Sequence, residues 1–105
     1  MAHSISKKAS RRLSYLTKII ARDGGVCVWC STPLQAEDKT ATIEHLIPLS
    51  CGGENVFQNM VLACASCNHH RQSTVAETWL AECKRQGLLS QPKIIFSALQ
   101  RVSVI

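Results

Sequence analysis

The chain has 105 residues, of which 46% are hydrophobic and 18% charged, as expected for one globular domain with a modest core. No apolar run approaches the ~18 residues that a membrane-spanning helix needs. The basic N-terminal segment also lacks the uninterrupted apolar stretch of a secretory signal. We therefore expect a cytoplasmic protein without a membrane span.

Charge is unevenly distributed along the chain. The twelve Lys and Arg residues exceed the seven Asp and Glu residues, which leaves a net charge of +5. Half of the basic residues precede Asp23, whereas the central segment 23–67 contains five acidic residues and one basic residue. Basic flanks around an acidic centre suit a polyanionic partner, with a cation held at the centre. Ordinary surface charge that keeps a domain soluble is an equally open explanation.

The first predicted element is a basic amphipathic helix from about Ser6 to Ala21, with Ser4 or Ser6 as its N-cap. Its apolar residues recur at helical spacing: Ala9, Leu13, Leu16 and Ile20. Most of its polar face is basic: Lys8, Arg11, Arg12, Tyr15, Lys18 and Arg22. This basic face either contacts nucleic acid or only keeps the exposed side of the helix in water. The DGG sequence that follows ends the helix.

Two identical cysteine pairs predict a metal site. The pairs are CVWC, with Cys27 and Cys30, and CASC, with Cys64 and Cys67. Two residues between cysteines let both thiolates face one ion from a tight turn, and two such turns complete the tetrahedral four-sulfur shell that zinc prefers. We therefore predict a structural zinc ion, which contributes to folding, rather than disulfides or redox pairs.

The remaining cysteines receive no role. Cys83 lies in an apolar helical pattern and is predicted to be buried, whereas Cys51 lies in the SCGGE turn and is predicted to be exposed.

Two strands are predicted between the cysteine pairs. TATIEHLI, at 40–47, alternates and is rich in β-branched residues. Glu44 and His45 would point to opposite faces of a regular strand, so both serve one site only if a loop or bulge redirects one of them. Pro48 stops this strand, and the glycine pair that follows permits a sharp reversal of the chain. The second strand is predicted for NMVLAC, at 59–64.

Helices are predicted for the rest of the chain. One begins near Ala65 or Ser66, breaks at Ser73 or Thr74, and continues through VAETWLAECKRQ until Gly87. In the part of this helix after the break, the residues expected to face inward are Val75, Trp79, Leu80 and Cys83.

A last helix is predicted from about Gln91 to Val102, with Pro92 in its first turn. Its apolar residues are Ile94, Ile95, Ala98, Leu99 and Val102. The C-terminal SALQRVSVI exposes apolar residues if it ends in solvent, which leaves a homodimer contact as an open alternative.

The predicted fold class is therefore α+β, with a small zinc-stabilised core of a two-stranded hairpin plus a helix, flanked by N- and C-terminal helices. We predict a single domain over 1–105. Within it, 6–22 is the basic helix, 27–72 is the zinc-bound core, and 74–105 forms the C-terminal helices.

The segment IEHLIPLSCGGENVFQNMVLACASCNHHR resembles the HNH endonucleases. That family carries a preceding CxxC, an acidic residue with a histidine, a proline, a glycine-containing loop, a central asparagine, and CxxCN followed by a basic residue. The match extends from Cys27 to Arg71, about half of the chain. The resemblance implies a ββα-metal core and an endonuclease that hydrolyses DNA phosphodiester bonds.

The resemblance also implies a role for each matching residue. His45 would be the general base that takes a proton from the attacking water. Glu44 and Asn68 would bind a divalent cation, Mg²⁺, Mn²⁺ or another, and Asn68 occupies the place of the family's final histidine, which makes this chain an H-N-N variant. Asn59 would hold the loop and the base in position, and Arg71 would clamp a phosphate oxygen.

The resemblance implies duplex DNA as the substrate, with low sequence specificity, because phosphate contacts position a protein without specifying bases. The residues expected to bind nucleic acid are Arg71, Lys8, Arg11, Arg12 and Lys18. RNA is an alternative substrate.

Two alternatives stay open. His69 or His70 can replace Asn68 as a ligand, and imidazole would favour a transition metal. A non-catalytic, zinc-stabilised nucleic-acid-binding module would account for the cysteines and the basic helix, although it has no use for a base beside a carboxylate. A zinc-ribbon scaffold for protein contacts would leave the polar cluster unexplained.

Overall fold

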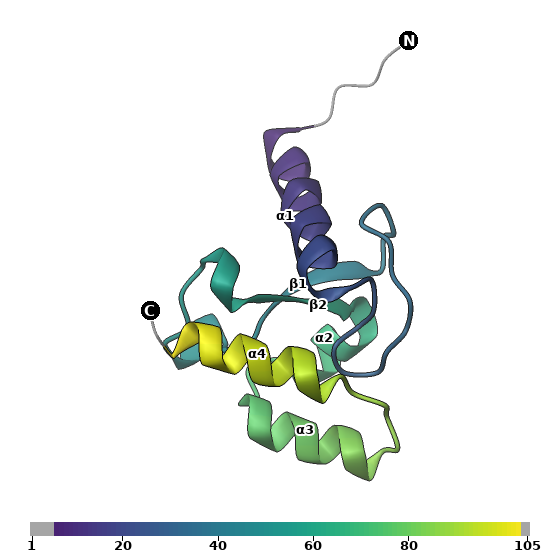
Figure 1. Cartoon of the computed structure of the whole chain (residues 1–105), viewed down its shortest axis with the longest axis vertical. Coiled ribbons are helices and arrows are strands. Elements are labelled where there is room, and N and C mark those ends of the chain that lie inside the picture. The colour runs from purple at the N-terminus through teal and green to yellow at the C-terminus, as the bar shows by residue number, and fades with distance from the viewer. Residues whose placement is uncertain (1–5, 104–105) are drawn as a thin grey trace.

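The computed structural model describes residues 6–103 and has a β-hairpin at its centre with helices around it (Figure 1). In chain order the elements are α1 (Lys7–Asp23), β1 (Ala41–His45), the 3₁₀ turns η1 (Leu49–Cys51) and η2 (Phe57–Asn59), β2 (Met60–Cys64), α2 (Ala65–Arg71), α3 (Ala76–Arg85) and α4 (Pro92–Val102). The α+β class predicted from the sequence is confirmed.

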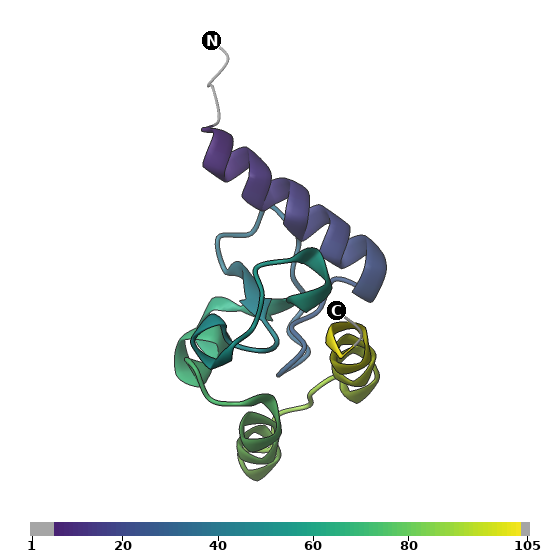
Figure 2. The ribbon, with the colours of Figure 1, turned by 90° about the vertical axis from the view of Figure 1, so that its left-hand side faces the viewer.

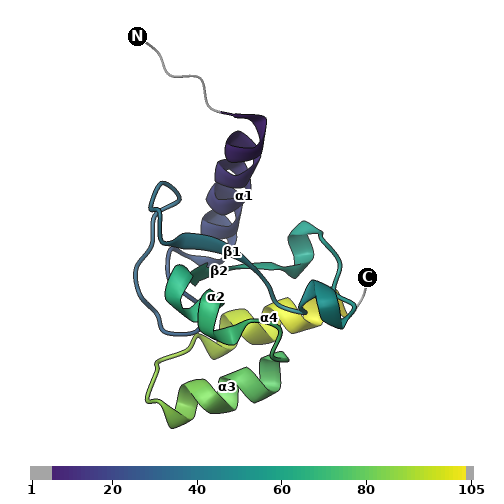
Figure 3. The same cartoon turned by 180° about the vertical axis from the view of Figure 1, so that it is seen from behind.

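β1 and β2 pair in antiparallel register, from Ala41 opposite Cys64 to His45 opposite Met60. All five residues of β2 are buried, because α1 packs across the hairpin on one side and α2 lies against it on the other (Figure 3). β1 is two residues shorter at its C-terminal end than the predicted 40–47. The Leu46 amide still donates to the carbonyl of Asn59 at 2.8 Å, in register with the hairpin, but Asn59 lies in η2 and the paired strand ends there.

α1 ends at Asp23, two residues beyond the predicted Ala21, and projects from the body of the molecule (Figures 1 and 2). Ser6 caps its start by accepting a hydrogen bond from the Ala9 amide, and the alternative cap Ser4 lies outside the described residues. Leu16 is buried, whereas Ala9, expected to face inward, is exposed because the first turns extend beyond the hairpin. Neither α1 nor any other helix within residues 6–103 is long and apolar enough to cross a membrane.

α3 and α4 complete the core below the hairpin (Figure 1). The expectation that Val75 faces inward is wrong, because Val75 is the N-cap of α3 and is 50% exposed. Cys83 is buried and Cys51 is exposed, as predicted. The segment before α4 is attached to the first cysteine turn by the Gln91 amide, which donates to the Val28 carbonyl at 2.8 Å.

Candidate functional site

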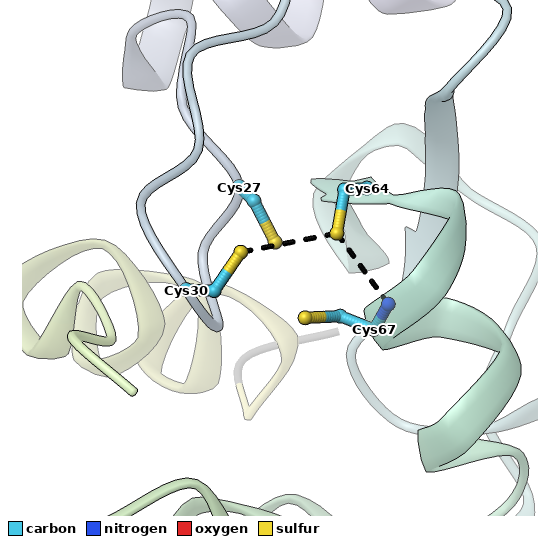
Figure 4. A group of neighbouring side chains, drawn as sticks. All are labelled: Cys27, Cys30, Cys64 and Cys67. Atoms are coloured by element: carbon cyan, nitrogen blue, oxygen red, sulfur yellow. Dashed lines mark hydrogen bonds between the residues drawn. The ribbon is translucent and has the colours of Figure 1, made fainter. Parts of the chain in front are cut away.

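The four predicted metal ligands converge, with their sulfur atoms turned toward a common centre (Figure 4). Cys27 and Cys30 come from the loop after α1, Cys64 ends β2, and Cys67 lies in the first turn of α2. All four sulfur atoms lie within 4.8 Å of one another, and those of Cys30 and Cys64 are 3.8 Å apart. A tetrahedral ion with Zn–S bonds of about 2.3 Å needs sulfur atoms about 3.8 Å apart. The cluster therefore fits a structural metal ion.

The first cysteine turn is held against the hairpin by backbone hydrogen bonds. The Cys27 amide donates to the Thr32 carbonyl at 2.9 Å, which closes the turn, and the Val28 amide donates to the Leu62 carbonyl of β2 at 2.9 Å. The second pair is already joined to the hairpin, because Cys64 is the last residue of β2. Pairing of the first turn with β2 thus brings distant ligands together.

The thiols differ in how readily they ionise. Burial raises the pKa of Cys27 to about 11, and burial together with neighbouring sulfur atoms also raises the pKa of Cys67. Burial opposes ionisation of Cys30 as well, but hydrogen bonds from the side chain and backbone of Thr32 outweigh it and lower the pKa to about 7. The Thr32 hydroxyl oxygen is 3.0 Å from this sulfur. A metal cation must replace the protons on the buried thiols.

Glu44 lies in the interior of the protein. Its side chain is 5% exposed, the Trp29 indole N–H donates to Oε2 at 3.1 Å, and Nη1 of Arg71 is 3.5 Å from Oε1. Burial raises the pKa of Glu44, and the opposite charge of Arg71 and the Trp29 hydrogen bond act against that rise. Glu44 therefore connects the first cysteine turn to α2 through a buried ion pair.

Arg71 does not face solvent, and the expectation that it clamps a phosphate is wrong. Its side chain is 0% exposed, and its guanidinium donates to the carbonyls of His45 at 3.0 Å, Leu46 at 2.5 Å and Thr74 at 2.9 Å. The guanidinium also lies 5.0 Å from the centre of the Trp29 ring. α2 packs against the hairpin, so this side chain points inward and holds the C-terminal end of β1.

Asn59 closes the loop between the strands. It is 1% exposed; its Oδ1 accepts from the Ile47 amide at 2.9 Å, and its Nδ2 donates to the carbonyls of Ile47 at 3.0 Å and Glu54 at 2.9 Å. Gly53 makes this closure feasible, because a Cβ there would lie 1.9 Å from the Ile47 carbonyl oxygen. The loop that follows His45 is therefore tied to the end of β1 by buried polar contacts.

His45, the last residue of β1, is half-buried, and its Nε2 lies 2.9 Å from Oδ1 of Asn55 in the loop. The ladder is regular through His45 and Met60, so the distortion that would turn Glu44 and His45 to one side is not seen within the paired residues of β1. The two side chains leave opposite faces of the strand. His45 meets the loop, and Glu44 meets α2.

Asn68 lies on the Glu44 side of the hairpin. Its Nδ2 donates to the Thr42 hydroxyl at 3.0 Å, and Thr42 and Glu44 share one face of β1 because they are two residues apart. Within residues 6–103, no hydrogen bond engages Oδ1 of Asn68. Glu44 and Asn68 thus reach the same face of the strand from β1 and α2. Their carboxylate and amide oxygens are hard donors that suit Mg²⁺ or Mn²⁺.

The alternative ligands His69 and His70 are both exposed on α2. Nδ1 of His70 lies 2.7 Å from the Ser66 carbonyl one turn earlier, to which it donates, and the His69 ring meets the His70 ring edge-on. Among His, Cys, Asp and Glu residues in the described part of the chain, the four cysteines are the only group of three or more placed to share an ion.

The basic residues of α1 divide into two kinds. Arg12 donates to the Ala41 carbonyl of β1, so part of its hydrogen-bonding capacity is used within the protein. Lys8, Arg11 and Lys18 are exposed, and none of them forms an ion pair with a described residue. These three cations are available to a polyanion.

Three contributors to the site were missed in the sequence: Trp29, Thr42 and Asn55. Trp29 carried a signal, because a large aromatic residue with one N–H inside a cysteine turn needs a buried acceptor. Thr42 carried a weaker signal, since strand alternation places it beside Glu44. Asn55 carried no signal, because a loop asparagine usually serves only its own turn.

Comparison with known proteins agrees with this fold. The family described as HNH endonuclease matches residues 27–83, more than half of the chain. The chain is also similar to the Type II-C Cas9 enzyme from Actinomyces naeslundii, with a TM-score of 0.64 and 19% identity over 97% of this chain. It spans 12% of the length of that enzyme. No curated protein sequence matches this chain.

The buried ion pair predicts a stability effect. Arg71→Met should lower the free energy of unfolding by about 3–5 kcal/mol, because it leaves the Glu44 carboxylate buried without a partner. The double variant Glu44→Gln/Arg71→Met should recover part of this loss, because no uncompensated charge remains. Chemical denaturation at neutral pH measures both values. Arg85→Met, which breaks an exposed pair with Glu82, is the control; an equal loss in this control would contradict the assignment.

The four-sulfur cluster predicts that the fold depends on metal. One equivalent of zinc should co-purify with the chain, and its removal by a chelator should abolish the cooperative thermal transition, because the ion holds the two turns together. Metal analysis and circular dichroism provide the measurements. Cys67→Ser should behave like the metal-free protein, whereas Cys51→Ser should retain metal and stability. A metal-free chain that keeps the wild-type transition would refute this dependence.

Proposed function

The chain belongs to the HNH endonuclease family, and on that basis we propose that it is a metal-dependent endonuclease that hydrolyses DNA phosphodiester bonds. The observation that supports this proposal is the arrangement around β1. An imidazole ends the strand, a carboxylate and an amide side chain reach one face of it from β1 and α2, and hydrogen bonds from α2 and the loop hold the residues concerned. A binding surface alone does not require these groups.

In this proposal His45 is the general base. It accepts a proton from a water molecule as that water attacks the phosphorus, and an imidazole suits the task near neutral pH. Arg71 contributes indirectly, because its bonds to the carbonyls of His45 and Leu46 fix the backbone that carries the base. Asn59 fixes the loop that faces His45, through its hydrogen bonds to the backbone of Ile47 and Glu54.

Glu44 and Asn68 would hold the catalytic divalent cation, and the cysteine cluster would hold zinc. When bound, a divalent cation supplies positive charge that stabilises the phosphate oxygens as negative charge develops on them. Glu44 is shared with Arg71 in this structure, so its carboxylate already lies beside one cation. Oδ1 of Asn68 accepts no hydrogen bond from a described residue, whereas the Glu44 carboxylate already has Arg71 as a partner.

The proposed substrate is duplex DNA with low sequence specificity. Lys8, Arg11 and Lys18 present exposed charge along the projecting helix α1 (Figure 2), and contacts of this kind bind the phosphate backbone without reading bases. The second candidate is a non-catalytic nucleic-acid-binding module. The Glu44–Arg71 pair favours it, because this pair gives the carboxylate a structural role without a catalytic metal.

Substitution of His45 distinguishes an endonuclease from a non-catalytic binding module. Purified protein should convert supercoiled plasmid to nicked or linear DNA with Mg²⁺ or Mn²⁺, and His45→Ala should slow this reaction by about 10²–10⁴-fold while binding DNA normally. Gel assays and binding isotherms measure the two effects. Glu77→Ala, at an exposed position of α3 away from β1, serves as the control. Undiminished cleavage by His45→Ala would remove this residue from the mechanism, and inactive wild-type protein would favour the binding module.

The basic helix predicts a salt-dependent contribution to binding. Lys8→Gln/Arg11→Gln should weaken DNA binding and reduce the slope of log affinity against log salt by about 2, because each phosphate contact contributes about 0.9 to the slope. Lys84→Gln/Lys93→Gln removes the same charge from α3 and α4 and should have a smaller effect. Binding isotherms at several salt concentrations measure the slopes. Equal slopes in the two double variants would show that α1 is only a scaffold.

A further inference from the structure

We propose that Asn55 is a positioning residue for the general base: its side-chain carbonyl holds the His45 ring with the proton on Nε2, so that Nδ1 accepts the proton from water. The inference deepens the proposed function and rests on it. Nε2 of His45 then serves to orient the ring and Nδ1 to accept the proton, and Asn55 has a role that the sequence alone did not indicate.

The geometry at the ring supports this assignment. Nε2 of His45 lies 2.9 Å from Oδ1 of Asn55, a normal hydrogen-bond distance. An amide oxygen only accepts hydrogen bonds, so Nε2 must donate and carry the proton of the neutral ring. In the described residues no hydrogen bond involves Nδ1. The lone pair of a neutral imidazole is then on Nδ1, the atom that can accept a proton.

The position of Asn55 is itself fixed by the loop. The Asn59 side chain donates to the carbonyl of the preceding residue, Glu54, at 2.9 Å, and it also binds the backbone of Ile47. The Gly53 amide donates to the Pro48 carbonyl at 3.0 Å. These bonds join the loop on either side of Asn55 to Ile47 and Pro48, which follow the strand that carries His45. Buried Asn59 therefore acts on the base through Asn55, without touching the ring in this structure.

Water, the phosphate, the His45 ring and solvent account for every bond and proton in the proposed step. As water attacks, its oxygen forms a bond to phosphorus, its proton moves to Nδ1, and the bond from phosphorus to the leaving oxygen breaks. The ring becomes an imidazolium with protons on both nitrogens, and Nε2 keeps its hydrogen bond to Asn55. The leaving oxygen takes a proton from solvent, and the ring later returns its own proton to solvent. The amide oxygen stabilises the charged ring throughout, because hydrogen bonds to charged groups are stronger than neutral ones.

Kinetics of two substitutions test the role. Asn55→Ala should lower kcat by about 10- to 100-fold, part of the contribution of a positioned base, with little change in KM because Asn55 does not hold the substrate. Asn55→Asp keeps an acceptor oxygen and should retain most of the activity. Gln58→Ala, in the same loop with an exposed side chain, should match the wild type. Equal losses in Asn55→Ala and Asn55→Asp, or a loss confined to KM, would overturn the proposal.

A spectroscopic measurement tests the hydrogen bond without DNA or cleavage. In ¹⁵N-labelled protein the ring proton of His45, identified by its absence in His45→Ala, should reside on Nε2 and exchange slowly with water. The signal should persist in Asn55→Asp and disappear through fast exchange in Asn55→Ala. A proton found on Nδ1, or a signal unaffected by Asn55→Ala, would overturn the inference even if the wild type cleaves DNA. A wild type that shows the predicted signal but does not cleave would instead refute the proposed function.

Discussion

The structure depends on the convergence of four sulfur atoms from two turns that lie far apart in the chain. Cys30 and Cys64 are 34 residues apart, yet their sulfur atoms are separated by 3.8 Å. A chain of this length buries a modest core, so a metal ion bound at this point would contribute directly to the stability of the fold. Such an ion would join the first turn to the end of β2 and the start of α2, the elements that supply the four sulfur atoms.

A buried polar network transmits this constraint to the candidate active site. Trp29 sits between the first two cysteines and donates to Glu44, which pairs with Arg71 from α2. Arg71 in turn binds the carbonyl of His45, the residue proposed as the base. Buried ion pairs often contribute little net stability, because desolvation offsets the attraction between the charges. Here the pair instead specifies how three segments meet, and loss of either charge leaves the other without compensation.

The loop between the strands constrains the opposite side of β1. Asn59 satisfies backbone groups at both ends of this loop, and Gly53 allows the close approach that a side chain would prevent. The candidate site is therefore held from two directions, by α2 on the Glu44 face and by the loop on the His45 face. The proposed chemistry needs both faces to contribute at the end of one strand, where the backbone leaves the ladder.

The sequence by itself determined the four ligands, the hairpin and α2, and the family, because cysteine spacing, strand alternation and helix periodicity are local properties that the chain displays directly. It also indicated Glu44, His45, Asn59 and Asn68 as the polar residues of interest. Only the tertiary structure decided which partners these side chains have. Arg71 appeared to be a surface cation in the sequence, yet it is buried because α2 packs that face of the helix onto the hairpin. The partners of Glu44 and His45 come from segments distant in sequence, and no local pattern encodes which elements will cover a given side chain.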